Sequence, residues 1–186
     1  TAHTLRAWAA WLPQLEGNAR TALKGSIARA LAFLEKRQRP DGTWVPLWFG
    51  NEHLASEENP VWGTSRVLLA LRDLRDKGFA VSAGAIARGT EALAAMQQPG
   101  GGWAGGPGAD LPASVEETGL ALEALAGSAH TRTVDRATSW LVERVEAGTW
   151  NEAAPLGFYF ARLWYFERLY PHLATVAGLG AAVRHL

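Results

Sequence analysis

The chain has 186 residues, a formal net charge of zero and no cysteine. A neutral chain without a basic run has nothing to steer a polyanion, so nucleic-acid binding is not expected. Without cysteine the chain can form neither disulfides nor thiolate metal sites, and its length is that of one domain, or part of one, with a sizeable core.

Two helices are predicted near the start of the chain. A short first helix is expected from His3 to Leu12, where leucine and tryptophan share one side. Asn18 is suited to cap a second, long helix that runs to Gln38, because its side chain can accept free amide hydrogens of the first turn. That helix should end there, since Pro40 restricts the residue before it and Gly42 permits a left-handed turn.

A short motif at the end of the long helix returns twice further along the chain. Each copy has leucine, glutamine, glycine and tryptophan in the same order. The first copy is Leu34, Gln38, Gly42 and Trp44, and the second, at identical spacing, is Leu93, Gln97, Gly101 and Trp103. A partial third copy has Leu141, Gly148 and Trp150, with Val145 at the glutamine position. We interpret each copy as a helix, a turn whose glutamine amide binds orphan carbonyl groups of the helix end, and a tryptophan that folds back as an apolar lid.

Four further helices are predicted after the first copy. They run from 64 to 76, from Ser82 to Gln97, from Ser114 to Leu125 and from 133 to 145. Ser82 is expected to cap its helix, and Ser114 with Glu117 forms a capping box. The glycine-rich stretch 100–112 lacks the Gly-Lys-Ser/Thr of a phosphate-binding loop and is interpreted as a flexible connector.

The last third of the chain is rich in aromatic residues. Leu156 to Tyr170 is predicted to form an aromatic helix that ends at Pro171, and no segment alternates with the period of two that is typical of strands. The predicted fold is therefore all-α, with repeated helix pairs that bury their faces against neighbours.

The repeat resembles the QW repeat of squalene-hopene cyclases and related class II terpene cyclases. Residues 33–44, which read Phe-Leu-Glu-Lys-Arg-Gln-Arg-Pro-Asp-Gly-Thr-Trp, carry the closest likeness. Thr1-Ala2-His3 resembles the family segment whose histidine assists the catalytic acid, and Trp62-Gly63-Thr64-Ser65 resembles its aromatic-Gly-Thr helix start. The aromatic stretch from Phe158 to Pro171 is similar to its C-terminal segment.

The resemblance implies a fold and a place within it. We expect an α/α toroid (a partial α/α barrel) made of helix pairs with QW-type repeats. Residues 1–186 would form a single segment of this toroid, from the C-terminal portion of a terpene cyclase catalytic domain.

The resemblance also implies which residues serve the reaction. His3 would hydrogen-bond the catalytic acid, while Trp48 and Trp62 would be active-site aromatics whose faces attract a carbocation. Phe158, Tyr159 and Phe166 are expected to bind substrate. For each of these aromatic residues the alternative is an ordinary core or surface position, and for His3 it is a solvated residue at the chain start.

Function follows from the same likeness. Such enzymes protonate and cyclise squalene or a related linear isoprenoid, and the resemblance implies neither a metal nor a redox cofactor. The family's acid lies in an upstream Asp-x-Asp-Asp motif, which this chain lacks. The N-terminal part of the same enzyme is therefore an expected partner, and the chain alone is predicted to be inactive.

The same residues allow two other functions to be compared with this one. A non-catalytic toroid module that binds isoprenoid lipid or acts as a scaffold stays open as the alternative. A protein prenyltransferase subunit is disfavoured, because its zinc site needs a cysteine ligand.

The expected location is the cytoplasmic face of a bacterial membrane, with peripheral, monotopic attachment. The resemblance implies attachment to one leaflet, and the apolar stretches Val45 to Phe49 and Leu156 to Trp164 are suited to it. No apolar run is long enough to span a bilayer. The acidic pairs Glu57-Glu58 and Glu116-Glu117 are interpreted as a solvated loop and a helix start.

Overall fold

The computed structural model describes residues 1–158 and 163–185. Its helices are α1 (Ala2–Trp11), η1 (Leu12–Gln14, a 3-10 turn), α2 (Gly17–Lys36), α3 (Pro60–Asp76), α4 (Ala83–Ala95), α5 (Val115–Leu125), α6 (Thr131–Glu146) and α7 (Leu169–Val183). Its strands are β1 (Phe49–Gly50), β2 (Pro155–Phe158) and β3 (Leu163–Phe166). The strands form one small antiparallel sheet in the order β1-β2-β3. The predicted helical fold is thus confirmed, with a sheet added to it.

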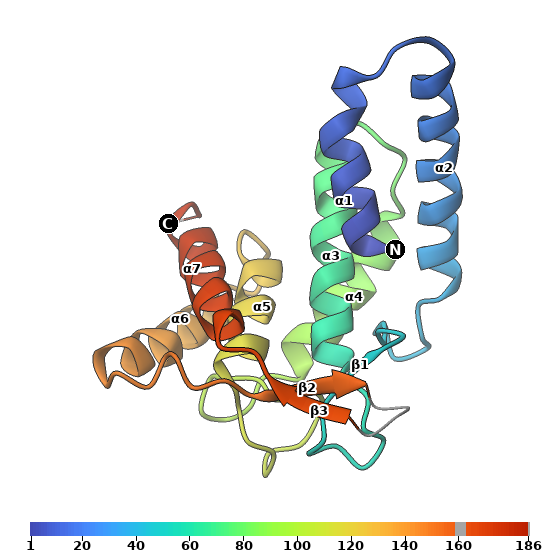
Figure 1. Ribbon diagram of the computed structural model, residues 1–186. Helices are drawn as coiled ribbons and strands as arrows, with labels where there is room; N and C mark the ends of the chain where they lie inside the picture. Colours follow the sequence, from blue (N-terminus) through green and yellow to red (C-terminus); the bar gives the residue numbers. More distant parts are fainter. Residues whose placement is uncertain (159–162, 186) are drawn as a thin grey trace.

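The helices form two rows. In the inner row α1 packs on α3, α3 on α5 and α5 on α7, so that contacting neighbours are every second helix of the chain. In the outer row α2 lies against α1, α4 against α3 and α5, and α6 against α5 and α7. Figure 1 shows α1 to α4 standing side by side, while α5 to α7 turn away and the sheet lies at the base of both groups. The chain therefore alternates between an inner and an outer helix.

The first copy of the repeated motif ties three helices of the two rows together. The indole N–H of Trp44 donates to the carbonyl of Leu34 in α2 at 2.7 Å, and its backbone N–H donates to the hydroxyl of Thr64 in α3 at 3.0 Å. The side-chain amide of Gln38 donates to the carbonyl of Ala85 in α4 at 2.9 Å. One tryptophan and one glutamine thus join an outer helix to the next inner helix and to the next outer helix.

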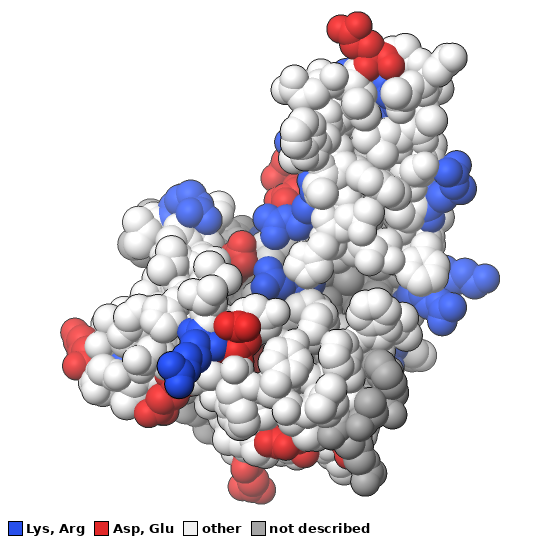
Figure 2. All heavy atoms as spheres, in the orientation of Figure 1, with Lys and Arg blue, Asp and Glu red and all other residues white. Residues whose placement is uncertain are grey.

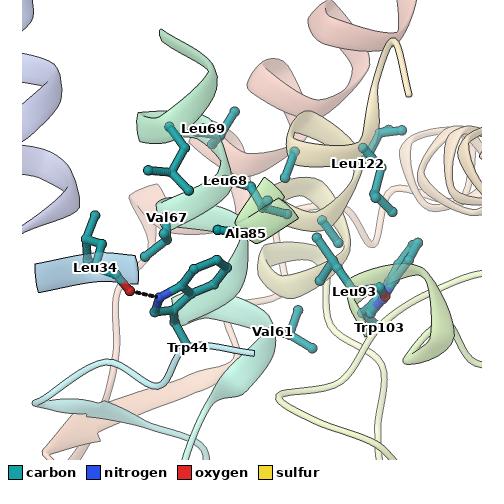
Figure 3. Close-up of a cluster of buried hydrophobic side chains, with 14 of the residues drawn as sticks. Leu34, Trp44, Val61, Val67, Leu68, Leu69, Ala85, Leu93, Trp103 and Leu122 are labelled. Carbon is teal, nitrogen blue, oxygen red and sulfur yellow. Dashed lines mark hydrogen bonds between the residues drawn. The ribbon is translucent and has the colours of Figure 1, made fainter. Parts of the chain in front are cut away.

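The second copy repeats this arrangement one helix pair later. Trp103 donates through its indole to Leu93 in α4 at 2.8 Å and through its backbone to Thr118 in α5 at 2.9 Å. Gln97 donates to the carbonyl of Thr133 in α6 at 2.9 Å. Figure 3 shows Trp44 and Trp103 within one buried apolar cluster. We call each of these sets, Gln38 with Trp44 and Gln97 with Trp103, a tryptophan clasp.

The clasps differ from the predicted role of the glutamines. Each amide also binds the glycine carbonyl of its own turn, Gly42 or Gly101, but its second bond goes to a neighbouring helix instead of the helix end. The two glycines have positive φ angles of 87° and 99°, a conformation that residues with a Cβ rarely adopt. In the partial third copy, Trp150 packs against the ring of His172 in α7 with centroids 4.5 Å apart.

The predicted aromatic helix from Leu156 to Tyr170 is wrong. Pro155 to Phe158 is β2 and Leu163 to Phe166 is β3, and Pro171 lies in the first turn of α7 instead of ending a helix. Aromatic residues suit a half-buried pleated strand when a neighbouring strand is available, and Gly157 weakens a helix interior. That neighbour is β1, where Phe49 pairs with Phe158.

Two local predictions at helix ends have different outcomes. Ser82 and Ser114 cap their helices by accepting from the backbone N–H of Ala85 and Glu117, as predicted. The predicted cap at Asn18 is wrong, because α2 begins at Gly17 with Glu16 at the N-cap position, and no side-chain hydrogen bond caps it.

The glycine-rich stretch is not the flexible connector that the sequence predicts along its whole length. Its residues 101–106 are all buried, and Trp103 is bonded to both α4 and α5.

No helix within the described residues is both long and apolar enough to cross a membrane.

We expect truncation of a clasp tryptophan to lower the stability of the fold substantially. Trp103 is 0% exposed, so Trp103→Ala should lower the free energy of unfolding by about 3–5 kcal/mol through lost burial and an unpaired Leu93 carbonyl. Trp11, which is 67% exposed, provides the control, and Trp11→Ala should change stability by less than about 0.5 kcal/mol. Urea unfolding measures both, and equal effects would show that the clasp carries no special stability.

Candidate functional site

A cavity of about 500 Å³ lies along the inner row of helices. Its walls come from α1, α3, α5 and α7, with β1, β2 and residue 154 closing one end. On α3 the cavity residues Trp62 and Arg66 are one turn apart, and on α5 Glu116, Leu120 and Glu123 follow one face. Figure 2 shows basic and acidic atoms close together in the hollow between the upright α1–α4 group and α7. The cavity is therefore aromatic and apolar with a charged wall.

Two of the predicted site residues meet in this cavity. His3 from α1 and Trp62 from α3 both line it, and their ring centroids are 5.8 Å apart. Phe49 of β1 packs against Trp62 with centroids 4.7 Å apart. Residues from the start of the chain and from α3 thus come together although the long helix α2 separates them in sequence.

The other predicted aromatic residues lie elsewhere. Trp48 is 55% exposed and touches Phe158 edge-on with centroids 6.4 Å apart. Phe158 in β2 is half-buried and Phe166 in β3 is exposed, and neither lines this cavity. Tyr159 lies outside the described residues. The substrate-contacting roles of these four residues stay predictions.

Glu117 anchors the loop before α3 to the cavity wall. Its carboxylate accepts hydrogen bonds from the side-chain amides of Asn59, at 2.9 Å, and Asn51, at 3.3 Å, and from the hydroxyl of Ser114. Asn59 also caps α3 by accepting from the backbone N–H of Trp62. Complete burial raises the pKa of Glu117, and the two amides oppose that rise.

Glu116 has a different environment from its neighbour. One of its carboxylate oxygens, Oε1, accepts from the backbone N–H of Ala154 at 2.8 Å. The other, Oε2, is buried and has no hydrogen-bond partner. Burial raises the pKa of Glu116 to about 7, with a smaller contribution from the charge of Glu117. Half of the Glu116 side chains are therefore ionised near neutral pH, at the wall of the cavity.

Arg66 and His3 complete the electrostatics of the site. The guanidinium of Arg66 lies 5.4 Å from the Trp62 ring centroid, and its Nε has no hydrogen-bond partner. Burial lowers the pKa of Arg66, while the charge of Glu123 opposes the shift. Burial also lowers the pKa of His3, helped by the nearby Arg66 charge. His3 is therefore a neutral imidazole at pH values near 7.

The family is decided by a comparison over nearly the whole chain. The family model described as the squalene-hopene cyclase C-terminal domain matches residues 9–183. The chain belongs to this family. Among solved structures, the ent-copalyl diphosphate synthase from Streptomyces platensis is similar with a TM-score of 0.63 and 21% sequence identity. No curated protein is similar enough to count as a match.

The structural likeness shows the fold and its extent. It covers 98% of this chain but only 32% of the synthase, so the chain spans about a third of that structure. The α/α toroid expected from the sequence is confirmed, and the two rows of helices are the inner and outer rows of such a toroid. The cavity of this squalene-hopene cyclase C-terminal domain lies on the inner row.

Sequence reasoning missed the charged wall of the cyclase-family cavity. Glu116 and Glu117 do lie in the first turn of α5, as predicted, but both are buried at the cavity wall. No sequence pattern indicated Arg66. The available signal was that α5 is otherwise apolar all round, which indicates a buried helix, so its three glutamates had to face a cavity or polar partners.

The raised pKa of Glu116 predicts a stability effect. Because the folded-state pKa lies above the ordinary value of 4.5, near 7, ionised Glu116 destabilises the fold, and this cost grows as pH rises from about 4.5 to 7. Glu116→Gln should therefore raise the free energy of unfolding by on the order of 3 kcal/mol at about pH 8, and should change it little at about pH 4.5. Urea unfolding at both pH values measures this.

A control variant distinguishes the effect of burying the Glu116 carboxylate from the effect of removing any negative charge. Glu143→Gln removes a carboxylate from an exposed position on α6 and should leave stability nearly unchanged at both pH values. A Glu116→Gln variant that is less stable than the wild type at about pH 8 would contradict the assigned cost of burial.

Proposed function

We propose that this chain is the C-terminal part of the catalytic toroid of a terpene cyclase and forms one wall of the cavity in which a linear isoprenoid is cyclised. The observation that carries the proposal is the meeting of His3 and Trp62 at one cavity, with ring centroids 5.8 Å apart. These are the residues whose sequence context resembles two catalytic segments of the family.

The chemistry assigns separate tasks to the residues present. Protonation of a terminal alkene of squalene, or of a related linear isoprenoid, creates a carbocation that moves along the chain as rings close. The aromatic faces of Phe49 and Trp62 attract such a cation, and more strongly in a cavity that excludes water. Leu120, Leu156 and Leu173 supply apolar surface for the hydrocarbon.

The acid is expected from another segment of the protein. No aspartate is among the described residues that line the cavity, and we propose that an Asp-x-Asp-Asp segment of the same enzyme supplies the proton. His3 is neutral near pH 7 for the reasons above. A neutral imidazole can accept a hydrogen bond from a protonated carboxyl group and so hold it in place.

Peripheral attachment to a membrane is part of the same proposal. Large apolar side chains of Leu47, Trp48, Leu163 and Phe166 are exposed on the sheet and on the segment that leads into β1. Trp48 touches Phe158, which pairs with Leu163 across β2 and β3, so Trp48 and Leu163 belong to one region of the surface. An exposed apolar surface rimmed by polar residues supports contact with a lipid leaflet, from which an isoprenoid would enter.

A non-catalytic module is favoured by one observation. The cavity wall carries Arg66, Glu116, Glu117 and Glu123, which is a more polar surface than a hydrocarbon alone requires. A toroid that binds an isoprenoid lipid by a polar end, without converting it, would use such a wall.

An assay of two proteins tests the proposal. The 186-residue chain and a longer protein, in which an Asp-x-Asp-Asp toroid segment encoded upstream precedes it, are each incubated with squalene, and products are identified by gas chromatography with mass spectrometry. We expect cyclic products only from the longer protein. Binding without products in the longer protein would favour the non-catalytic module, and turnover by the 186-residue chain alone would contradict the proposed supply of the acid.

The roles of His3 and Trp62 are tested in the longer protein. His3→Ala should lower kcat by on the order of 100-fold, the lower end of what general acid catalysis contributes, because the acid would lose the group that holds it. Trp62→Leu should lower kcat by about tenfold through loss of the cation-attracting face. Trp11→Leu, an exposed position on α1, is the control and should leave kcat unchanged.

A further inference from the structure

Glu117 makes contacts that its place at a helix start does not explain. In a capping box, the glutamate three residues after the N-cap accepts a hydrogen bond from the backbone N–H of the N-cap residue. Here the backbone N–H of Ser114 donates to the carbonyl of Trp103 at 2.9 Å instead. The Oε2 of Glu117 still accepts from the Ser114 hydroxyl, but its Oε1 accepts from two residues outside its own helix.

These two residues are the ends of the loop 51–59, which connects β1 to α3. The side-chain amide of Asn51, at the β1 end, donates to Glu117 Oε1 at 3.3 Å, and that of Asn59, at the α3 end, donates to the same oxygen at 2.9 Å. Both asparagines are buried, with exposed fractions of 3% and 0%. A single buried oxygen atom therefore closes the loop.

Each tied asparagine lies close in sequence to an aromatic residue of the cavity. Phe49 of β1 comes shortly before Asn51, and Trp62 lies in the first turn of α3, after Asn59. The Oδ1 of Asn59 accepts from the backbone N–H of Trp62 at 2.9 Å. Asn51 has little room to move, because a Cβ on Gly105 would lie 2.5 Å from its own Cβ. The two ends of the loop thus carry the two rings whose centroids are 4.7 Å apart.

The Glu117 carboxylate is poorly placed to react with a substrate. It is 2% exposed, and its oxygens already accept from three side-chain donors, the two asparagine amides and the Ser114 hydroxyl. Burial of a carboxylate is costly unless it is hydrogen-bonded. A buried polar network whose members are satisfied makes a structure rigid and specifies one arrangement of it. Holding other groups in place therefore explains Glu117 better than contact with a substrate does.

We propose that Glu117 is a positioning residue that sets the relative placement of Phe49 and Trp62, and with it the shape of the aromatic wall of the cavity. It acts through Asn51 and Asn59 and does not itself contact the substrate. Its effect on turnover rests on the proposed function, in which this wall faces the carbocation. Its effect on the two rings does not depend on turnover.

The placement of the rings is measured by NMR on the 186-residue chain without a substrate. Each indole N–H gives a signal in a proton–nitrogen correlation spectrum, and the signal that Trp62→Phe removes belongs to Trp62. The position of this signal includes the ring current of Phe49, which Phe49→Leu abolishes. Glu117→Met keeps the length of the side chain but offers only a weak acceptor. It should therefore move the Trp62 signal toward its position in Phe49→Leu.

Glu117→Gln is the matched variant. Its amide oxygen can accept from Asn51 and Asn59, and its amide nitrogen can donate to the hydroxyl oxygen of Ser114. The hydrogen bonds thus survive without the charge, and we expect the Trp62 signal to stay at its wild-type position. A carboxylate that merely contributed charge to the cavity would not be replaced in this way.

Two further measurements guard against a general loss of structure. The indole N–H of Trp44 is bonded to Leu34 of α2, so an unchanged Trp44 signal shows that the helices remain packed. Asn51→Ala frees only the β1 end of the loop and leaves Glu117 with its other two donors. If Glu117→Met does not fold, Asn51→Ala should move the Trp62 signal in the same direction.

The longer protein tests the consequence for turnover. Glu117→Met should lower kcat by about tenfold, as Trp62→Leu does, because a displaced ring no longer faces the reacting carbon. Combined with Trp62→Leu it should lower kcat little further, since both changes act through one ring. Glu117→Gln should retain the wild-type kcat, and Glu143→Gln, exposed on α6, is the charge control.

Two results would overturn the proposal. One is a folded Glu117→Met variant, or a folded Asn51→Ala variant where the first does not fold, whose Trp62 signal keeps its wild-type position. The other is a Glu117→Gln variant whose Trp62 signal moves as far as that of Glu117→Met, since the hydrogen bonds would then not be what places the ring. Neither result requires turnover, so a longer protein without cyclic products would contradict the proposed function alone.

Discussion

The tryptophan clasps determine how this structure holds together. In each clasp a single indole N–H closes the end of an outer helix, while the backbone of the same tryptophan binds a threonine of the next inner helix. The glutamine reaches the following outer helix. The two tryptophan bonds of each clasp are made by groups that would otherwise be buried without partners. Because every clasp connects one helix pair to the next, the inner row is held in a fixed curve, and the cavity forms on that row.

The cavity wall contains buried charged groups that lower the stability of the fold. Helix α5 is buried on nearly every side, yet its first turns carry two glutamates. Glu117 offsets part of its desolvation cost through bonds from Ser114, Asn51 and Asn59, and the two asparagines also hold the loop before α3. Glu116 has a single donor, the Ala154 N–H. The α5–α7 contact needs glycines at the crossing, where a Cβ on Gly119 would clash with the Ala174 backbone carbonyl. This close approach brings Leu173 and Ala174 to the same cavity wall as Glu116.

The aromatic C-terminal segment illustrates the limit of local patterns. Leu156 to Tyr170 has the apolar density of a buried helix, and nothing within it reveals that β1, far earlier in the chain, offers a strand edge. Pairing with that edge satisfies the backbone of β2 and decides the structure. The same distant contact places Phe158 and Trp48 together and sets the apolar surface beside the sheet. Strand formation in this segment therefore depends on a contact with a distant part of the chain.

The helical repeat, the caps at Ser82 and Ser114, and the family are all predicted by short stretches of sequence. Those features depend on residues a few positions apart, whose chemistry local rules capture. The sequence also indicated His3 and Trp62, because their short segments resemble known ones. The packing of the helices brings Glu116, Glu117 and Arg66 to one cavity, leaves Trp48 and Phe166 outside its lining, and lets the clasps link different helices. Burial, and with it the cost of an unpaired charge, depends on which helices pack together, and no local pattern records that packing.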